Sequence, residues 1–365
     1  MNIKERIHYI DIAKGIAMIL VILGHTKKLV SPTIVWWLYT FHMPLFFILS
    51  GMVFNPDKYK SFKEMFKSKF KSLIIPYISL CLIAWFWTMI VKQPTDFLSQ
   101  KTMKKFIGIF LGERGGTYYF SMWFMTALFL SEVLLYSLTK LLKNKKLFFS
   151  IGFAISSILG CLIIKNINSG FYWSADLVPI SISFIIVGYF LKTYKEKLDF
   201  RKYQNTIIMI VMMGVNIFTG YMNYKSNGRA DLYELNIGNP IYYYISSLCG
   251  SFSVIVFCKL IKKSIVLEYI GRNSLIYYAF QKMLFINPLL VIVKTMSKLG
   301  GIFTNKTIQL LIVVVCTCIG LAIVSETITK CFPFLLGKFK TNKRIIEETK
   351  KEQNKKLEEK IYEKV

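Results

Sequence analysis

Apolar stretches of about 20 residues recur along the whole chain and are separated by shorter polar segments. An α-helix of this length crosses the hydrocarbon core of a bilayer, so each stretch is a candidate transmembrane span. We predict spans at residues 10–26, 33–54, 73–91, 120–139, 147–164, 175–191, 205–223, 241–261, 267–291 and 307–329. The pattern therefore predicts an all-α integral membrane protein with about ten transmembrane helices.

The longest polar stretches are residues 92–119, 223–240 and 332–365, and none of them has the size of a soluble domain. Segment 92–119 contains the turn-forming run GERGGTYY and is long enough to act as a lid or to contact a substrate. The C-terminal segment is rich in Lys and Glu, and it is either a short amphipathic helix or a solvated tail. We therefore divide the chain into a transmembrane domain, 1–331, and a charged tail, 332–365.

The 47 Lys and Arg residues, which give a net charge of +27, are distributed unevenly between the two sets of loops. With a cytoplasmic N-terminus, most of them fall in cytoplasmic segments, including the lysines between Lys58 and Lys71 and those of the tail. This bias predicts a multi-pass cell-membrane protein with both termini in the cytoplasm. Because topology and contact with anionic lipids explain the charge, we expect no nucleic-acid partner.

Three patterns that the sequence lacks narrow its interpretation. The seven Cys residues lie within or beside apolar spans and form no Cys-x-x-Cys pair, so we expect buried structural thiols and no metal site. The N-terminal basic residues Lys4 and Arg6 precede the first span, but no small-residue cleavage site follows, so this span is expected to be retained. A Gly-x-Ser-x-Gly nucleophile motif is also absent from the sequence.

Lys14 and His25 both lie on the first span, eleven residues apart. This spacing puts them on one face of a helix and about 16 Å apart along its axis. Ionisable residues inside a membrane are costly and usually face a protein interior or a water-filled path, where they take part in function. We therefore expect the chemistry of this protein near these two residues.

Approximate depths along the spans group the polar residues into two layers. Lys14 and Arg272 form a cationic layer near the cytoplasmic face, joined from the loop by Lys69 and Lys71, and such a layer suits an anionic phosphate. The second layer lies higher and contains His25, His42 and Gln281. Imidazole titrates near neutral pH, so this layer suits acid–base catalysis.

Each of these residues also has a structural interpretation, which the sequence leaves open. Asp11 and Lys14 are three residues apart and could neutralise each other, or Lys14 could reach the lipid headgroups. His25 could be interfacial, and the His42 ring could bond a backbone carbonyl freed near Pro44. The remaining structural roles are interhelical bonding for Glu132, orientation for Lys69 and Lys71, and an aromatic belt for Trp123.

Five segments together resemble the membrane acyltransferase family 3, in particular its fucose 4-O-acetylase-like and polysaccharide O-acetyltransferase subgroup. The segments are YIDIAKGIAMILVILGH (9–25), FHMPLFFILSG (41–51), KFKSLIIPY (69–77), MWFMTALF (122–129) and YIGRNSLIYYAFQ (269–281). They occur in the order expected of the family, and the resemblance spans about residues 9–330.

The resemblance implies transfer of an acetyl or other acyl group from cytoplasmic acyl-CoA, as a donor substrate and not a bound cofactor, to a sugar hydroxyl. The acceptor would be a cell-surface polysaccharide or a lipid-linked glycan, and glycan-synthesis enzymes would be partners. His25 would act as general base or transient acyl carrier, with His42 and Lys14 as further catalytic residues. Lys14, Lys69, Lys71 and Arg272 would hold the CoA phosphates. The substrate-binding residues would be Asp11, Trp123, Glu132, Asn273 and Gln281.

This sequence departs from the family pattern at two positions. Lys14 stands where the family usually has Arg, which keeps the charge but loses the bidentate fork of a guanidinium. Gln281 stands where many relatives have His, so it can form hydrogen bonds but cannot transfer protons in the same way. Two other functions remain open from the residues: an exporter or flippase of a glycan, and a scaffold of a synthase complex.

Overall fold

The computed structural model describes residues 7–92, 99–113, 122–142, 145–167, 170–194 and 202–338. The predicted tail therefore lies almost entirely outside the described residues, as does most of the GERGGTYY run. The α-helices are α1 (His8–His25), α2 (Pro32–Tyr39), α3 (His42–Val53), α4 (Phe62–Lys69), α5 (Ile75–Lys92), α6 (Gln100–Leu111), α7 (Trp123–Leu141), α8 (Lys145–Asn166), α9 (Val178–Thr193), α10 (Lys202–Asn227), α11 (Pro240–Ile261), α12 (Ile265–Arg272), α13 (Ser274–Phe280), α14 (Asn287–Met296) and α15 (Lys306–Cys331).

Short 3₁₀ and π turns join or extend these helices. The 3₁₀ turns are η1 (Pro56–Lys58), η3 (Tyr172–Leu177), η6 (Ser297–Leu299), η7 (Gly301–Thr304) and η8 (Pro333–Leu336), and the π turns are η2 (Phe70–Ile74) and η5 (Gln281–Ile286). Among the described residues the β-pairing consists of one isolated bridge, between Asp231 and Asn236. The predicted all-α class is confirmed.

Within the described residues, ten helical stretches are long and apolar enough to span a membrane, which confirms the predicted number. Their burial separates core from periphery: 72% of the apolar window in Pro32–Val53 is buried, compared with 22% in Lys306–Cys331. The peripheral helices α8, α10 and α15 accordingly present large apolar side chains on the outer surface. This arrangement is typical of a membrane protein, because apolar side chains on its outer surface contact lipid hydrocarbon and not water.

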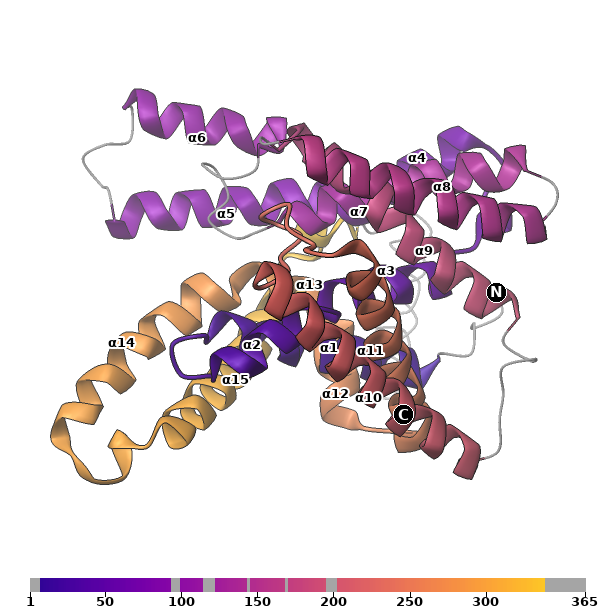
Figure 1. The fold of residues 1–365 in the computed structure, drawn as a ribbon. Helices are drawn as coiled ribbons and strands as arrows, with labels where there is room; N and C mark the ends of the chain where they lie inside the picture. Colours follow the sequence, from indigo (N-terminus) through magenta and orange to yellow (C-terminus); the bar gives the residue numbers. More distant parts are fainter. Residues whose placement is uncertain are drawn as a thin grey trace, which may run out of the picture.

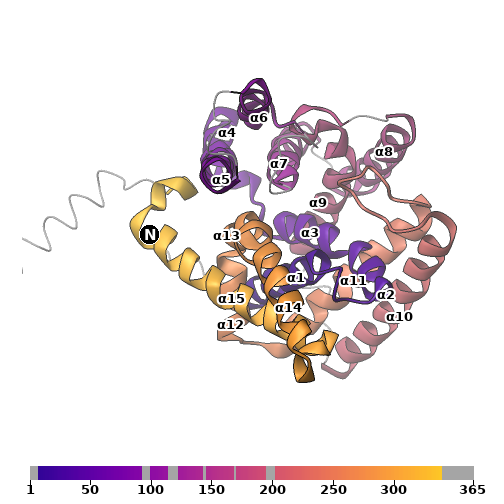
Figure 2. The same ribbon diagram turned by 90° about the vertical axis from the view of Figure 1, so that its left-hand side faces the viewer.

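Helix α1 lies at the centre of the molecule, against α2, α3, α11, α12 and α13 (Figures 1 and 2). Glycines allow two close helix crossings, one between α12 and α1 and one between α9 and α3. A Cβ atom at Gly271 of α12 would overlap the Asp11 carbonyl oxygen of α1, and one at Gly188 of α9 would overlap the Ile48 carbonyl oxygen of α3. Small residues at such crossings let membrane helices pack backbone to backbone. The crossings fix the positions of α1 and α3, which carry Lys14, His25 and His42.

The second predicted span is interrupted at Thr40 and Phe41, between α2 and α3. Pro44 cannot donate a backbone hydrogen bond to the Thr40 carbonyl, and the Ser247 hydroxyl of α11 donates to that carbonyl instead, at 2.6 Å. Asn216 of α10 adds a second bond, to the Thr40 hydroxyl at 3.3 Å. The Ser247 side chain of a neighbouring helix thus satisfies the backbone carbonyl where the span breaks.

The ninth span begins later than predicted. The sequence pattern puts its start at residue 267, whereas α12 ends at Arg272 and the span runs over Ser274–Met296. The apolar run continues through Ile265–Ile270, so hydropathy alone does not detect the break at Asn273. Arg272 therefore lies outside the span and is exposed.

Candidate active site

Two neighbouring cavities lie beside α1. The first, here called the Lys14 cavity, has a volume of about 220 Å³, and the second, the His25 cavity, has a volume of about 180 Å³. Met43 of α3 and Tyr278 of α13 contribute to the walls of both. The two cavities therefore meet at these side chains, between the two ends of α1.

The Lys14 cavity has a mixed lining. Its polar residues are Lys14, Lys69, Glu132 and three serines, and its apolar residues include Phe46, Leu73 and Phe124. Lys69 and Glu132 form an ion pair at 2.9 Å between α4 and α7, with both side chains largely buried. The Glu132 carboxylate thus acts as an interhelical partner for Lys69, one of the alternatives that the sequence left open. The cavity offers ammonium and hydroxyl groups beside an apolar wall.

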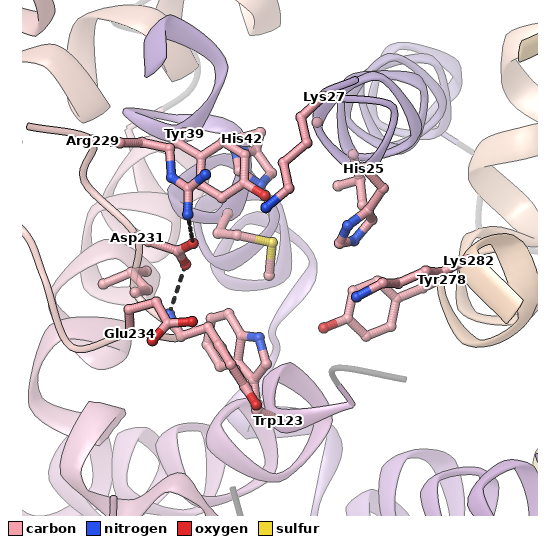
Figure 3. Close-up of a pocket in the computed structure, with 15 residues that line it drawn as sticks. His25, Lys27, Tyr39, His42, Trp123, Arg229, Asp231, Glu234, Tyr278 and Lys282 are labelled. Atoms are coloured by element: carbon pink, nitrogen blue, oxygen red, sulfur yellow. Dashed lines mark hydrogen bonds and ion pairs between the residues drawn. The ribbon is translucent and has the colours of Figure 1, made fainter. Parts of the chain in front are cut away.

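The His25 cavity is richer in charge. Figure 3 shows the His25 ring projecting into it from one side, with Tyr278 and Lys282 nearby, while Arg229 and Asp231 face it from the opposite side. Lys27 and Glu234 also line the space. Among the described residues, no protein group forms a hydrogen bond with the His25 ring, so both ring nitrogens are open to a substrate.

His42 is held in one tautomer. Its Nδ1 lies 2.6 Å from the Leu38 carbonyl oxygen, in the last turn of α2. A carbonyl only accepts, so Nδ1 carries the proton and Nε2 of the neutral ring is left as an acceptor. His42 is buried, and its ring packs edge-on against Tyr39 with 4.9 Å between ring centroids. This geometry suits a proton acceptor or relay and not a neutral donor that polarises a carbonyl.

The loop between α10 and α11 closes the His25 cavity. Arg229 donates to Asp231 at 3.0 Å, and its guanidinium stacks over the Tyr39 ring at 4.5 Å from the centroid. Asp231 in turn accepts from the Tyr233 backbone N–H at 3.1 Å and pairs with Asn236 in the isolated bridge. Burial raises the pKa of the Asp231 carboxyl, an effect that neighbouring Arg229 opposes. The loop is therefore tied both to itself and to α2.

Six of the predicted site residues line the cavities. Lys14, Lys69 and Glu132 line the Lys14 cavity, and His25, His42 and Trp123 line the His25 cavity. The other five, which line neither cavity, are Asp11, Lys71, Arg272, Asn273 and Gln281. Lys71 and Arg272 are exposed, and the Asn273 amide donates to the Tyr269 carbonyl at 3.0 Å.

Gln281 does not line the His25 cavity, contrary to its predicted substrate-binding role, and the neighbouring Lys282 does. Gln281 is instead buried. Both residues belong to the π turn η5, in which the Asn287 N–H bonds the Lys282 carbonyl, five residues back. Pro288 lacks the N–H that would continue the regular pattern, and this wider turn changes which side chains share a face. A regular helix was assumed in the sequence prediction.

Sequence reasoning also missed the charged residues of the α10–α11 loop, Arg229, Asp231 and Glu234. The run GRADLYELNIGN contains the turn residues and charges that would mark a structured loop. The sequence gives no sign that this loop lies over His25, because its contacts join segments about 190 residues apart along the chain.

Comparison with known proteins identifies the family to which the chain belongs. The family model of the acyltransferase domain, acyltransferase family 3, matches residues 7–326 and so covers most of the chain. The chain belongs to this family. The matched region contains all residues that line the two cavities. The protein is thus a multi-pass member of the acyltransferase family, with helices suited to span a membrane.

A curated relative supports the same assignment. Over 139 residues the chain is 31% identical to the nodulation protein NolL of Mesorhizobium japonicum. The aligned part covers 35% of each of the two chains. No solved structure matches the chain.

Among the described residues there is no group of three His, Cys, Asp or Glu side chains that could hold a metal ion.

Proposed function

We propose that this acyltransferase moves an acyl group, in the first instance acetyl, from cytoplasmic acyl-CoA to a hydroxyl of a cell-surface polysaccharide or lipid-linked glycan. The observation that carries the proposal is the meeting of the Lys14 and His25 cavities at Met43 and Tyr278. One cavity provides cations near an apolar wall, and the other provides two imidazoles with carboxylates and aromatic rings. This division matches a donor site and an acceptor site on one path.

The donor site is the Lys14 cavity. The Lys14 ammonium attracts the phosphates of CoA. Lys69 also attracts them, although its charge is partly neutralised by the ion pair with Glu132. The apolar wall of Phe46 and Leu73 suits the pantetheine arm and the acyl chain. With both termini in the cytoplasm, as the distribution of basic residues predicts, this end of α1 faces the compartment that supplies acyl-CoA.

The acceptor site is the His25 cavity. Carboxylates accept bonds from sugar hydroxyls, and the rings of Tyr39, Trp123 and Tyr278 offer faces and edges to a sugar. His25 takes the proton from the attacking hydroxyl, whose oxygen forms a bond to the thioester carbonyl carbon. The carbon–sulfur bond then breaks, and the CoA thiolate recovers the proton from His25. If His25 instead carries the acyl group transiently, the same cavity serves both half-reactions.

Transfer of label tests the proposal directly. Membranes that contain the protein, supplied with radiolabelled acetyl-CoA, are expected to incorporate label into extracellular glycan, whereas matched membranes without the protein are not. Absence of label in both would contradict acyl transfer. Glycan that keeps its acetyl groups but no longer reaches the cell surface when the protein is deleted would favour a glycan exporter.

Lys14 variants test the donor site. Lys14→Ala is expected to raise the KM for acyl-CoA about tenfold, because one charge-assisted bond to a phosphate is lost. Lys14→Arg keeps the charge and is expected to retain the wild-type KM within about twofold. Initial rates at varied acyl-CoA concentration measure both. If the KM for acyl-CoA rose as much in Lys14→Arg as in Lys14→Ala, the positive charge alone would not explain how residue 14 binds the donor.

Asp231 variants test the acceptor site. Asp231→Asn keeps an oxygen for the Tyr233 N–H but loses the charge, so the KM for the acceptor is expected to rise about fivefold or more while that for acyl-CoA stays unchanged. Burial raises the pKa of Asp231. As the pH falls, the acceptor KM of the wild type should therefore begin to rise at pH values above the usual aspartate pKa, which is near 4. The asparagine variant should lack this pH dependence. Equal changes in both KM values would contradict the division of sites.

A further inference from the structure

A third cavity, separate from the two described above, lies where the end of α1 meets the α14–α15 hairpin. It is an open pocket of about 930 Å³, and we call it the lysine pocket after Lys28, Lys294, Lys298 and Lys306, which line it. Figure 1 shows α14 and α15 as a hairpin that projects from the rest of the helices. The residues that line this pocket include no Asp or Glu.

Neutral polar side chains lie beside the lysines, and three of their hydroxyls donate to backbone carbonyls: Thr295 to Val291 at 3.1 Å, Ser297 to Lys294 at 2.7 Å and Thr304 to Gly301 at 2.8 Å. The side chains of Asn287, Thr295, Ser297 and Thr304 line the pocket together with the four lysines. Lys306 is also the first residue of α15, and the helix dipole gives this end of α15 a partial positive charge. An ammonium cluster with no carboxylate among the residues that line it is suited to a phosphate or diphosphate.

The pocket also has an apolar wall. Leu29, Leu290 and Val293 line it, and Val291, which lines it too, is 65% exposed. The neighbouring Ile292 is exposed as well, so this face of α14 has an apolar surface for lipid to cover. A phosphate bound here would therefore be joined to a hydrocarbon chain lying along α14. A free nucleotide or sugar phosphate has no hydrocarbon chain that would contact this apolar wall.

The lysine pocket adjoins the His25 cavity. Lys27 lines the His25 cavity and the next residue, Lys28, lines the lysine pocket. On the other wall, Lys282 lines the His25 cavity and Asn287, about 7 Å farther along the helical rise, lines the lysine pocket. A ligand whose phosphate occupies the pocket can therefore place the group next to that phosphate in front of His25.

We infer that the lysine pocket holds the phosphate of a lipid that carries the acceptor glycan. Such a molecule has the three parts that the site requires: a hydrocarbon chain for α14, a phosphate or diphosphate for the lysines, and an attached sugar for the His25 cavity. A bulk anionic phospholipid has the first two and lacks the third. The inference rests on the proposed acyl transfer, since it identifies the class of acceptor.

The test compares the same glycan in two forms, one linked to polyprenyl diphosphate in vesicles and one free in water. The variant Lys294→Gln/Lys298→Gln removes two charges from the pocket, and Lys63→Gln/Lys67→Gln removes two exposed charges from α4 as a matched control. Each interfacial lysine contributes about fivefold to binding, so the loss of two is expected to raise the KM for the lipid-linked acceptor about 25-fold. The KM for the free glycan and for acyl-CoA should stay unchanged, and the control variant should resemble the wild type.

Binding without acyl donor separates this inference from the proposed reaction. Purified protein should bind polyprenyl diphosphate vesicles more tightly than phosphatidylglycerol vesicles of equal charge, and the pocket variant should lose that preference. This result can be obtained even if no acyl transfer is detected. Equal binding of the two lipids, an unchanged KM for the lipid-linked acceptor, or an equal rise for the free glycan would each overturn the inference.

Discussion

Replacing His25 with alanine is expected to lower acyl transfer by about 100- to 10,000-fold, the range that a positioned acid–base group contributes. His25 ends α1 inside the His25 cavity, and no hydrogen bond from the described part of the chain occupies its ring. The substitution removes a cavity-lining side chain and leaves the packing of α1 against α12 in place. The rate of label transfer from acetyl-CoA at saturating substrates measures the effect.

Two further variants make this result specific. His8→Ala is a matched histidine control, because His8 contacts Glu268 at 3.0 Å and lines neither cavity, so transfer should be nearly unchanged. His25→Gln preserves hydrogen bonding but not titration, and should be about as inactive as His25→Ala. Activity retained in His25→Gln would show that His25 only binds the substrate, and activity retained in His25→Ala would remove it from the mechanism.

Replacing Gly271 with alanine is expected to cost about 3 kcal/mol or more of folding free energy, or to prevent folding. The added Cβ would overlap the Asp11 carbonyl oxygen, and a backbone atom cannot move aside as the end of a flexible side chain can. The helices α1 and α12 would have to separate, which would displace Lys14 from its cavity. Thermal unfolding in detergent, followed by intrinsic fluorescence, measures the loss.

Gly214→Ala is the matched control for this prediction. Gly214 lies within α10, and a Cβ there would meet no atom within 4 Å. Alanine should therefore stabilise the helix by about 0.5–1 kcal/mol, because glycine is the more costly residue in a helix interior. If Gly271→Ala unfolded at the same temperature as Gly214→Ala, the close crossing of α1 and α12 would be wrong.

The number of spans could be predicted because it depends on a local property. A stretch of about 20 apolar residues must be helical in a bilayer, whatever surrounds it, since its backbone polar groups can be satisfied only within the segment. The location of Lys14 and His25 in different cavities follows from the geometry of a single helix. Eleven residues of helical rise separate them, and the structure indeed brings one to each cavity.

Other predicted residues were misplaced because helical geometry within one segment does not predict breaks in a helix. Arg272 and Gln281 were placed by counting along a regular helix, but the chain breaks at Asn273 and widens into a π turn at Gln281. Those irregularities depend on neighbours that satisfy the backbone, which a hydropathy pattern does not contain. The same limit applies to Glu132, whose pairing with Lys69 joins two helices that are far apart in the sequence.

The sequence by itself determined the class of the protein, its ten spans and the shared helix of Lys14 and His25, because hydrophobic length and helical periodicity act within a single segment. The tertiary structure alone decided that Arg229 and Asp231 close the cavity in front of His25 and that His42 keeps its proton on Nδ1. It also assembled the four lysines of the lysine pocket from three separate segments. These features arise from contacts between distant parts of the chain, whose free energy is set by packing and charge in three dimensions and leaves no periodic signal in the sequence.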